Sequence, residues 1–530
     1  VGAVRVGLML GVSLAALDMT IVATSVRTIA DDLGGLELQA WATTAYLISS
    51  AVTTPLYGRL SDVHGRKPLF LVAIGIFVLG SLACTFATSM YQLAIFRAVQ
   101  GLGAGGLFSL SVTIIGDLVP PRERARWTGL LIAVYGVFGV LGPVVGGLLA
   151  DTPEILGLTG WRWVFGLNVP VGLLAFAVVA RVLAPGNRAA AGRRVDWAGA
   201  GALALGVVPL LVVADEGRKW GWTSYPAVLC YLVGVAGLLA FVFVEHGMGE
   251  DAVAPLRLLR NPTFRLGTVA GVVVGFGMFG VITALPLYLQ IVGGASPTGA
   301  GLLMLPLVAG IVVTTAVSGR VIEATARYRS WLVLGVGMMI VGLLWLSAMD
   351  ADTPFVETAV CMAVFGIGLG ANLQSITLAV QNALPSSEVG VATASTTFAR
   401  QLGGSAGAAV FLAILFGTVR DRIEAAFRTA AGTPAFRDAV SDPAVAGVPA
   451  NAEVIRALSG DGSGIGAVLE DSSFLATLHP ELARPFLVGF SDALGVVFLA
   501  GAVVLVLGLG AVLAMPDDRL RHDGEIGEGG

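Results

Sequence analysis

The chain has 530 residues, of which 56% are hydrophobic and only 12% are charged, and its formal net charge is −4. Soluble globular domains carry about 25% charged residues, so this composition excludes an ordinary soluble protein. The mean hydropathy of +0.86 and the long, unbroken apolar stretches indicate a helical membrane protein rather than a barrel of short alternating strands.

Fourteen stretches of the chain are apolar enough and long enough to cross a bilayer as helices, which takes about 20 residues each. An even number of spans would bring both termini to the same side of the membrane. The predicted spans cover residues 4–32, 39–60, 67–88, 90–118, 123–151, 160–184, 196–215, 223–245, 263–291, 297–320, 328–349, 354–384, 388–418 and 485–514.

Arginine and lysine are unevenly divided between the two sets of connecting loops. The loop at 58–67 and every second loop after it carry most of the cations, whereas the loops between them carry few. Because positively charged loops remain in the cytoplasm, this asymmetry predicts a multi-pass protein of the cytoplasmic (inner) membrane with both termini cytoplasmic.

One segment on the predicted outer side, residues 419–484, is far longer than the other outer loops and is mixed in charge. Two stretches within it, Arg420–Ala431 and Ala452–Leu458, are weakly amphipathic as helices. The segment is therefore either a mobile extracytoplasmic loop or a small helical cap that guides substrate or contacts a partner.

The sequence contains an internal repeat with an interval of roughly 260 residues. Gly58-Arg59 is echoed by Gly319-Arg320 at the start of a charged loop, and Ala98–Gly103 is echoed by Ala363–Gly368. A duplicated pattern of this kind predicts two related six-helix halves, the architecture of many secondary transporters. The predicted domains are an N-terminal six-helix bundle (1–184), a linker with two extra transmembrane helices (185–250), a C-terminal six-helix bundle that includes segment 419–484 (251–515), and a cytoplasmic tail (516–530).

Six short motifs follow one another along these spans. They are Leu17–Val22, Gly58–Lys67, Arg97 with Gln100–Gly103, Gly139 with Gly142-Pro143 and Gly146-Gly147, Trp161–Trp163 with Asn168–Pro170, and Arg400–Gly404. In this order they resemble the major facilitator superfamily, specifically the fourteen-span drug:proton antiporters of the EmrB/QacA type, over nearly the whole chain. The resemblance implies an all-α polytopic membrane protein with the major facilitator fold: two six-helix bundles plus two inserted central helices, or 14 transmembrane helices.

Asp18 is a carboxylic acid about 14 residues into the first span, roughly 21 Å along the helix and near the bilayer midplane. An ionised carboxylate at that depth is costly, so it must titrate, pair with a cation or line water. These requirements suit a proton carrier, and a structural acid bonded to neighbouring helices is the alternative. Arg97 does not readily lose its proton, so its predicted part in proton coupling is to influence a nearby acid; a packing salt bridge is its alternative.

The resemblance implies that the charged loop at 58–67 forms a conformational latch on the cytoplasmic side. In this interpretation Asp62 and Arg66 bond with Asp117 when the cavity opens outward, and the bonds break when the cytoplasmic side opens. An ordinary positively charged cytoplasmic loop is the other interpretation. The predicted latch residues are Gly58, Asp62, Gly65, Arg66, Lys67 and Asp117.

The fifth span carries a motif that resembles the antiporter helix motif of this family. The resemblance implies that this motif seals the cavity against leak. Proline bends the helix and glycines allow close contact, so simple helix packing is the alternative. The motif residues are Gly139, Gly142, Pro143, Gly146 and Gly147.

Several polar, aromatic and methionine residues within the second half are candidates for a substrate cavity. A deep arginine would bind an anionic group or pair with an acid, and methionine with phenylalanine would form an adaptable apolar wall. Bonds between helices and lipid-facing packing are the alternatives. The candidates are Arg400, Asn372, Gln374, Phe276, Met278 and Phe279.

These features together predict a proton-coupled multidrug efflux transporter that exports hydrophobic compounds by alternating access, using the proton gradient and no cofactor. Its partners would be small hydrophobic substrates or lipids, protons and the bilayer, with no nucleic acid, and the family expectation is a monomer. Export of lipids or cell-envelope precursors by the same fold is the first alternative. A non-transporting receptor or scaffold would not need buried ionisable residues, and an enzyme would need clustered nucleophiles, bases or metal ligands, which the sequence lacks.

Overall fold

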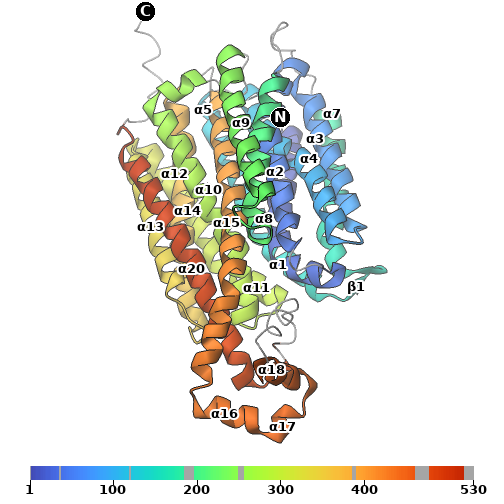
Figure 1. Cartoon of the computed structure of the whole chain (residues 1–530). Helices are drawn as coiled ribbons and strands as arrows, with labels where there is room; N and C mark the ends of the chain where they lie inside the picture. The colour runs from blue at the N-terminus through green and yellow to red at the C-terminus, as the bar shows by residue number, and fades with distance from the viewer. Residues whose placement is uncertain are drawn as a thin grey trace, which may run out of the picture.

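The computed structural model describes residues 2–34, 38–118, 121–183, 196–248, 256–384, 389–459, 475 and 477–517 as a long helical bundle (Figure 1). The first part comprises α1 (Gly2–Leu33), α2 (Gln39–His64), α3 (Arg66–Thr85), α4 (Met90–Leu118), α5 (Pro121–Asp151), α6 (Trp163–Gly166) and α7 (Asn168–Val182). A short hairpin of β1 (Glu154–Ile155) and β2 (Leu158–Thr159), followed by η2 (Gly160–Arg162), joins α5 to α6.

Two helices follow, α8 (Trp197–Trp220) and α9 (Tyr225–Met248), and then the 3₁₀ turn η4 (Leu256–Arg260). The last part comprises α10 (Pro262–Leu287), the π-helical turn η5 (Tyr288–Val292), α11 (Pro297–Leu303), α12 (Leu305–Thr325), α13 (Arg329–Ser347), α14 (Phe355–Asn382), α15 (Val389–Ala430), α16 (Pro434–Ser441), α17 (Pro443–Ala446), α18 (Pro449–Ser459) and α20 (Pro480–Leu513).

Every one of the fourteen predicted spans contains helix. Within the described residues, eleven helices are both long and apolar enough to cross a membrane. The exceptions are α2, α5 and α8; in α5 and α8 the apolar stretches Val137–Asp151 and Trp197–Val213 are shorter. The helical, multi-pass architecture is thus confirmed, and the count of fourteen transmembrane helices stays a prediction.

The helix contacts of the first part of the bundle recur in the last part. In the first part α1 packs on α5, α2 and α3 pack on α4, and α7 packs on α1 and α3. In the last part α10 packs on α15, α12 and α13 pack on α14, and α20 packs on α10 and α13. This correspondence supports the predicted duplication, although the domain boundaries stay predictions and the linker 184–195 lies outside the described residues. The two halves meet where α2 contacts α15 and where α5 contacts α11 and α12.

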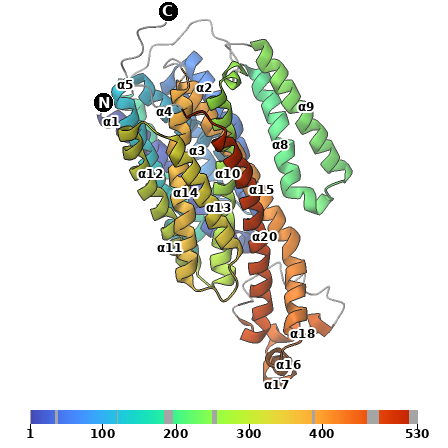
Figure 2. The same ribbon diagram turned by 90° about the vertical axis from the view of Figure 1, so that its left-hand side faces the viewer.

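The two extra helices stand to one side of the bundle as an antiparallel pair (Figure 2). Of the pair, α8 contacts both α2 and α15, one helix from each half. Leu203, Val207 and Leu211 of α8 pack with Ile48 of α2 and Phe398 of α15 in one apolar cluster. This pair therefore lies along one of the two seams between the halves.

The described parts of segment 419–484 are folded as helices, which favours the cap over the mobile loop. With 42 residues, α15 is roughly 63 Å long at 1.5 Å per residue and extends beyond the bundle together with α20 (Figure 1). Phe427 of α15 makes edge-to-face contacts with Phe436 of α16 and Phe486 of α20, at ring-centre distances of 6.0 and 4.9 Å. The start of α1 and the end of α20 lie at the end of the bundle opposite this cap.

Gly65 forms the whole junction between α2 and α3, with φ of +91° and ψ of 153°. Only glycine adopts this conformation without strain, and Lys67 Nζ fixes the start of α3 by donating to the Ala180 carbonyl of α7 at 2.7 Å. Gly65→Ala is therefore expected to lower the free energy of unfolding by about 1–3 kcal/mol.

The measurement is reversible unfolding of the purified protein in detergent. Gly58→Ala is the matched control, because Gly58 lies within α2 and a Cβ atom there would meet no atom within 4 Å. Equal stability of the two variants would contradict the strain assigned to Gly65.

Candidate functional site

Asp18 lies in the middle of α1, is fully buried, and is held by donors from two other helices. Arg97 Nη1 of α4 donates to Asp18 Oδ2 at 2.7 Å and forms an ion pair with it. Gln100 Nε2 of α4 and Asn168 Nδ2 of α7 donate to Asp18 Oδ1 at 2.7 and 2.8 Å. The carboxylate therefore accepts three hydrogen bonds and is paired with a cation, which offsets its desolvation.

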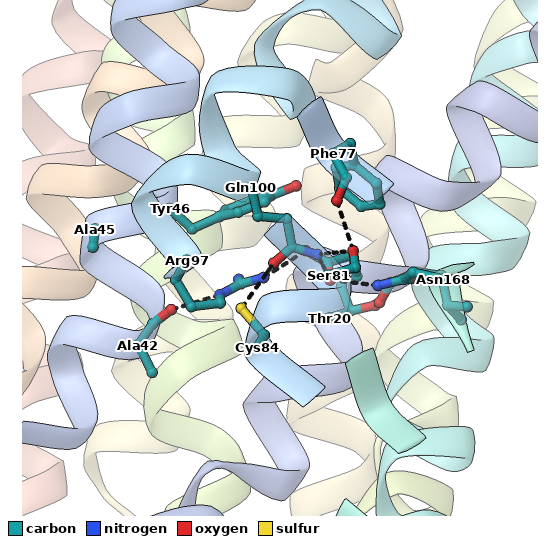
Figure 3. A network of polar contacts seen from close by, with 12 residues as sticks. Thr20, Ala42, Ala45, Tyr46, Phe77, Ser81, Cys84, Arg97, Gln100 and Asn168 are labelled. Carbon is teal, nitrogen blue, oxygen red and sulfur yellow. Dashed lines mark hydrogen bonds and ion pairs between the residues drawn. The ribbon is translucent and has the colours of Figure 1, made fainter. Parts of the chain in front are cut away.

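A second layer of contacts holds these donors in place (Figure 3). Arg97 Nε donates to the Ala42 carbonyl of α2 at 2.8 Å, and its guanidinium lies 4.1 Å from the centre of the Tyr46 ring. Arg97 Nη1 donates to Gln100 Oε1 at 2.6 Å, and Gln100 Nε2 donates to Ser81 Oγ of α3 at 2.7 Å. The network thus joins α1, α2, α3, α4 and α7, all from the first half.

Asp18 is the member of this bonded set that can take up a proton. The arginine that pairs with it stays protonated, and the amides and hydroxyl do not ionise in the physiological range. The sequence predicted both Asp18 and Arg97 as coupling residues but missed Gln100, Asn168, Ser81 and Tyr46 as their partners. The available signals were the position of Gln100 one turn after Arg97 and the presence of Gln100 and Asn168 in two of the motifs.

The antiporter helix motif is the place where α1, α5 and α11 meet. Thr24 Oγ1 and Ser25 Oγ of α1 donate to the carbonyls of Pro143 and Gly146 at 3.1 and 2.9 Å. Helix α5 continues through Pro143, and the backbone of Gly301 in α11 packs directly on Pro143. A side chain larger than hydrogen at Gly146 or Gly301 would collide with backbone atoms of the neighbouring helix.

A small cavity lies between the two halves and borders the Asp18 network. Arg97 and Tyr46 reach its wall from the first half, and Phe279 and Leu412 reach it from the second. One lining residue, Arg97, is charged, and most of the others are apolar. The lining residues are Met19, Val26, Gln39, Thr43, Tyr46, Leu47, Arg97, Phe279, Ile282, Thr283, Leu287 and Leu412.

Residues 8–408 match the family model described as Major Facilitator Superfamily. The chain belongs to the Major Facilitator Superfamily. This membership makes it a membrane transporter and not an enzyme.

Two curated relatives of this Major Facilitator transporter come from Bacillus subtilis (strain 168). It is 33% identical to the "Multidrug transporter protein MdtP" over 410 residues, 77% of this chain and 74% of the relative. It is 32% identical to "Multidrug resistance protein 3" over 444 residues, 83% of this chain and 85% of the relative. A Mycobacterium tuberculosis (strain ATCC 25618 / H37Rv) relative, "Uncharacterized MFS-type transporter Rv1877", is 33% identical over 530 residues, 98% of this chain and 71% of the relative.

Solved structures show the same fold at low sequence identity. A bacterial homologue of the human lysosomal transporter Spinster, in an inward-facing conformation, aligns with a TM-score of 0.63 and 16% identity, covering 97% of this chain and 96% of the other. The proton:xylose symporter XylE aligns with a TM-score of 0.56 and 14% identity, covering 98% of this chain and 97% of the other.

One of the six predicted substrate-cavity residues lies in the wall of the described cavity. Of these six, Phe279 is among its lining residues. Phe276 packs edge-to-face on Phe411, with ring centres 5.7 Å apart, and Met278 is buried. Asn372 donates to the Gly368 carbonyl at 2.9 Å, facing α13, and Gln374 lies against Gly319 of α12.

The latch residues of this Major Facilitator transporter are only partly described. The side chains of Asp62 and Asp117 lie outside the described residues, so the predicted bonds of Asp62 and Arg66 with Asp117 stay predictions. Arg66 Nη1 donates to Ser61 Oγ of α2. The loop is thus tied at Arg66 to α2 and at Lys67 to α7.

Proposed function

We propose that this transporter is a fourteen-span drug:proton antiporter of the EmrB/QacA type that exports hydrophobic compounds by alternating access. The observation that carries the proposal is that the buried Asp18–Arg97 network borders the cavity between the halves through Arg97 and Tyr46. A proton site and a substrate site that share residues give each ligand a direct means of changing the binding of the other.

Protonation of Asp18 is the step that links the proton to the conformational change. A neutral carboxyl no longer balances the charge of Arg97, and removing one partner of a buried ion pair costs about 3–5 kcal/mol. A two-state equilibrium moves from 1:99 to 99:1 for about 5.5 kcal/mol. Protonation changes which state predominates only by as much as this ion pair differs between the two states, and a difference of this size would be most of the free energy that the change needs.

The cavity wall suits hydrophobic cargo, because most of its residues are apolar and a methionine and a phenylalanine are among them. The close packing of α1, α5 and α11 at the antiporter motif supports a seal at the end predicted to be extracytoplasmic. The names of the two Bacillus relatives, a multidrug transporter and a multidrug resistance protein, favour drugs as cargo.

The remaining parts of the proposal follow from the sequence. The protein lies in the cytoplasmic (inner) membrane as a monomer with both termini in the cytoplasm. Its bundles occupy 1–184 and 251–515, the linker with the two extra helices 185–250, and the tail 516–530. Bonds of Asp62 and Arg66 with Asp117 latch the cytoplasmic end when the cavity opens outward.

The test is substrate-triggered proton movement in proteoliposomes that contain a pH-sensitive dye. An imposed pH gradient should drive uptake of a hydrophobic compound by wild-type protein, and adding the compound should move protons in the opposite direction. A compound that crosses at the same rate with and without the gradient, and moves no protons, would overturn the antiporter assignment.

A second function, export of lipids or envelope precursors, is favoured by the helical cap. The described cap extends α15 and α20 beyond the bundle and has a packed aromatic core, so it can present a surface to a molecule leaving the cavity. Shortening residues 431–479 to a flexible linker should leave drug export intact under the first function. Loss of labelled-lipid transfer in that variant, with no drug export in wild type, would establish the second.

A further inference from the structure

Arg400 is the twelfth residue of α15 and lies at the seam between the two halves, where its neighbour Gln401 is bonded to α2. Its backbone is covered by α10, because a Cβ atom at Gly275 would collide with the Arg400 carbonyl oxygen. Its side chain interacts electrostatically with Tyr135 of α5, which belongs to the opposite half. The residue as a whole is neither fully buried nor exposed.

The charge of Arg400 has no counter-ion within the part of the chain that the structure describes. No hydrogen bond or ion pair of its guanidinium is found there, and the ionisable group that it interacts with is the phenol of Tyr135. Arg97 is the contrasting case, because its guanidinium is bonded to the Asp18 carboxylate, Gln100 and the Ala42 carbonyl. A charged side chain at membrane depth normally pairs with an opposite charge or a ligand.

The surroundings of Arg400 combine polar groups with apolar walls. Its neighbour Gln401 accepts a hydrogen bond from Thr54 Oγ1 of α2 at 2.8 Å, which joins α15 to the first half. Tyr135 Oη donates to Met19 Sδ at 3.1 Å, and the Tyr135 ring packs edge-to-face on Phe108 at 5.4 Å. Met19 follows Asp18 directly in the chain, so this seam adjoins the proton site.

The charges around the seam disfavour a cationic cargo. Asp18 is already occupied by Arg97, and the lining of the described cavity includes one cation and no acid. A guanidinium offers a planar set of donors that matches carboxylate and phosphate oxygens, and hydrogen bonds between charged groups are the strong ones. The partner that Arg400 lacks among the described residues at this seam is therefore an anion.

We infer that the transported molecule carries an anionic group, a carboxylate, sulfonate or phosphate on an apolar body, and that Arg400 binds this group. This inference rests on the proposed function and specifies its substrate class. The anion can belong to a lipophilic organic acid or to the headgroup of an anionic lipid.

The test compares binding of matched probes to purified protein in neutral detergent at one fixed pH. The probes are 1-pyrenedodecanoate as a lipophilic anion, its methyl ester as the uncharged counterpart, and tetraphenylphosphonium as a lipophilic cation. The wild type should bind the anion more tightly than the ester and the cation. Arg400→Gln should weaken anion binding roughly tenfold to a hundredfold, the usual range for a hydrogen bond to a charged group, and leave the ester unchanged.

Two further variants separate charge from folding. Arg400→Lys should recover part of the anion affinity, and Arg420→Gln on an exposed turn of the same helix, where Arg420 pairs with Glu424 at 3.1 Å, should bind like wild type. Equal loss of all three probes in Arg400→Gln, or undiminished anion binding, would overturn the inference.

Competition decides the source of the anion. Displacement of the dye by phosphatidylglycerol but not by phosphatidylcholine would assign the site to a lipid headgroup, and displacement by a soluble lipophilic carboxylate alone would assign it to organic acids. Proton-coupled export of tetraphenylphosphonium without anion binding would overturn this inference and leave the proposed function intact. Anion binding that depends on Arg400, without any proton movement, would support this inference and overturn the proposed function.

Discussion

Asp18→Asn is expected to reduce substrate-driven proton movement by at least about 100-fold, the usual loss when a positioned proton-transfer group is removed. Asparagine still accepts hydrogen bonds from Gln100 and Asn168 but cannot take up a proton, so the step that links the gradient to the conformational change is lost. The measurement is the dye signal of proteoliposomes after substrate is added, at equal amounts of reconstituted protein.

Asp32→Asn is the matched control for this variant. Asp32 lies on the same helix and its side chain is 42% exposed, with a long ion-pair distance of 4.0 Å to Arg162. It accepts a hydrogen bond from Trp161 Nε1 at 2.8 Å that an asparagine oxygen can also accept. Because Asp18→Asn leaves Arg97 buried without its counter-ion, the double variant Asp18→Asn/Arg97→Gln serves as a second test with no buried charge. Normal coupled transport by either Asp18 variant would refute the assignment.

Gly146→Ala is expected to damage transport more than any other alanine in the antiporter motif. The new methyl group would collide with the backbone oxygen of Ile21, which cannot move without separating α5 from α1. The same separation would break the Ser25 Oγ bond to the Gly146 carbonyl. We expect the free energy of unfolding to fall by about 1–3 kcal/mol and proton leak without substrate to rise.

The control is Gly139→Ala, two helical turns earlier in the same motif, where an added Cβ atom would meet no atom within 4 Å. Leak is followed as dissipation of a pH gradient in the absence of substrate, and stability as unfolding in detergent. If both variants leak equally, close packing of α1 on α5 is not what seals the cavity.

The sequence was sufficient for features that depend on local composition. The helical segments follow from apolar length, and the helical contacts of the first half recur in the second. The direction of the helices across the membrane, inferred from the arginines of alternate loops, stays a prediction. The pairing of Asp18 with Arg97 could not be predicted with the same ease, because the two residues are separated by 79 positions and each also suited a purely structural role. The packing of α1 on α4 and α7 in the folded protein brings Asp18 and Arg97 together.

The side-chain directions of the cavity candidates could not be predicted for a physical reason. In a membrane bundle a helix is apolar on both its lipid-facing and its protein-facing sides, so hydrophobic periodicity does not reveal which side faces the partner half. For Asn372 the sequence left a substrate-facing position and bonding between helices open, and in the structure it donates to the Gly368 carbonyl and lies against α13. Tyr46 borders the cavity and stacks on Arg97, but the sequence does not indicate this role because one tyrosine in a span is common.

The helices α8 and α9 also affect the route by which a molecule dissolved in lipid reaches the interior. They stand outside the line where α2 meets α15, and α8 packs on both. A molecule diffusing in the leaflet must pass this extra layer before it reaches that line. Lateral entry is therefore unequal around the circumference of the protein, and a bulky, membrane-partitioned cargo would find its shorter path beside α5 and α12, on the opposite flank.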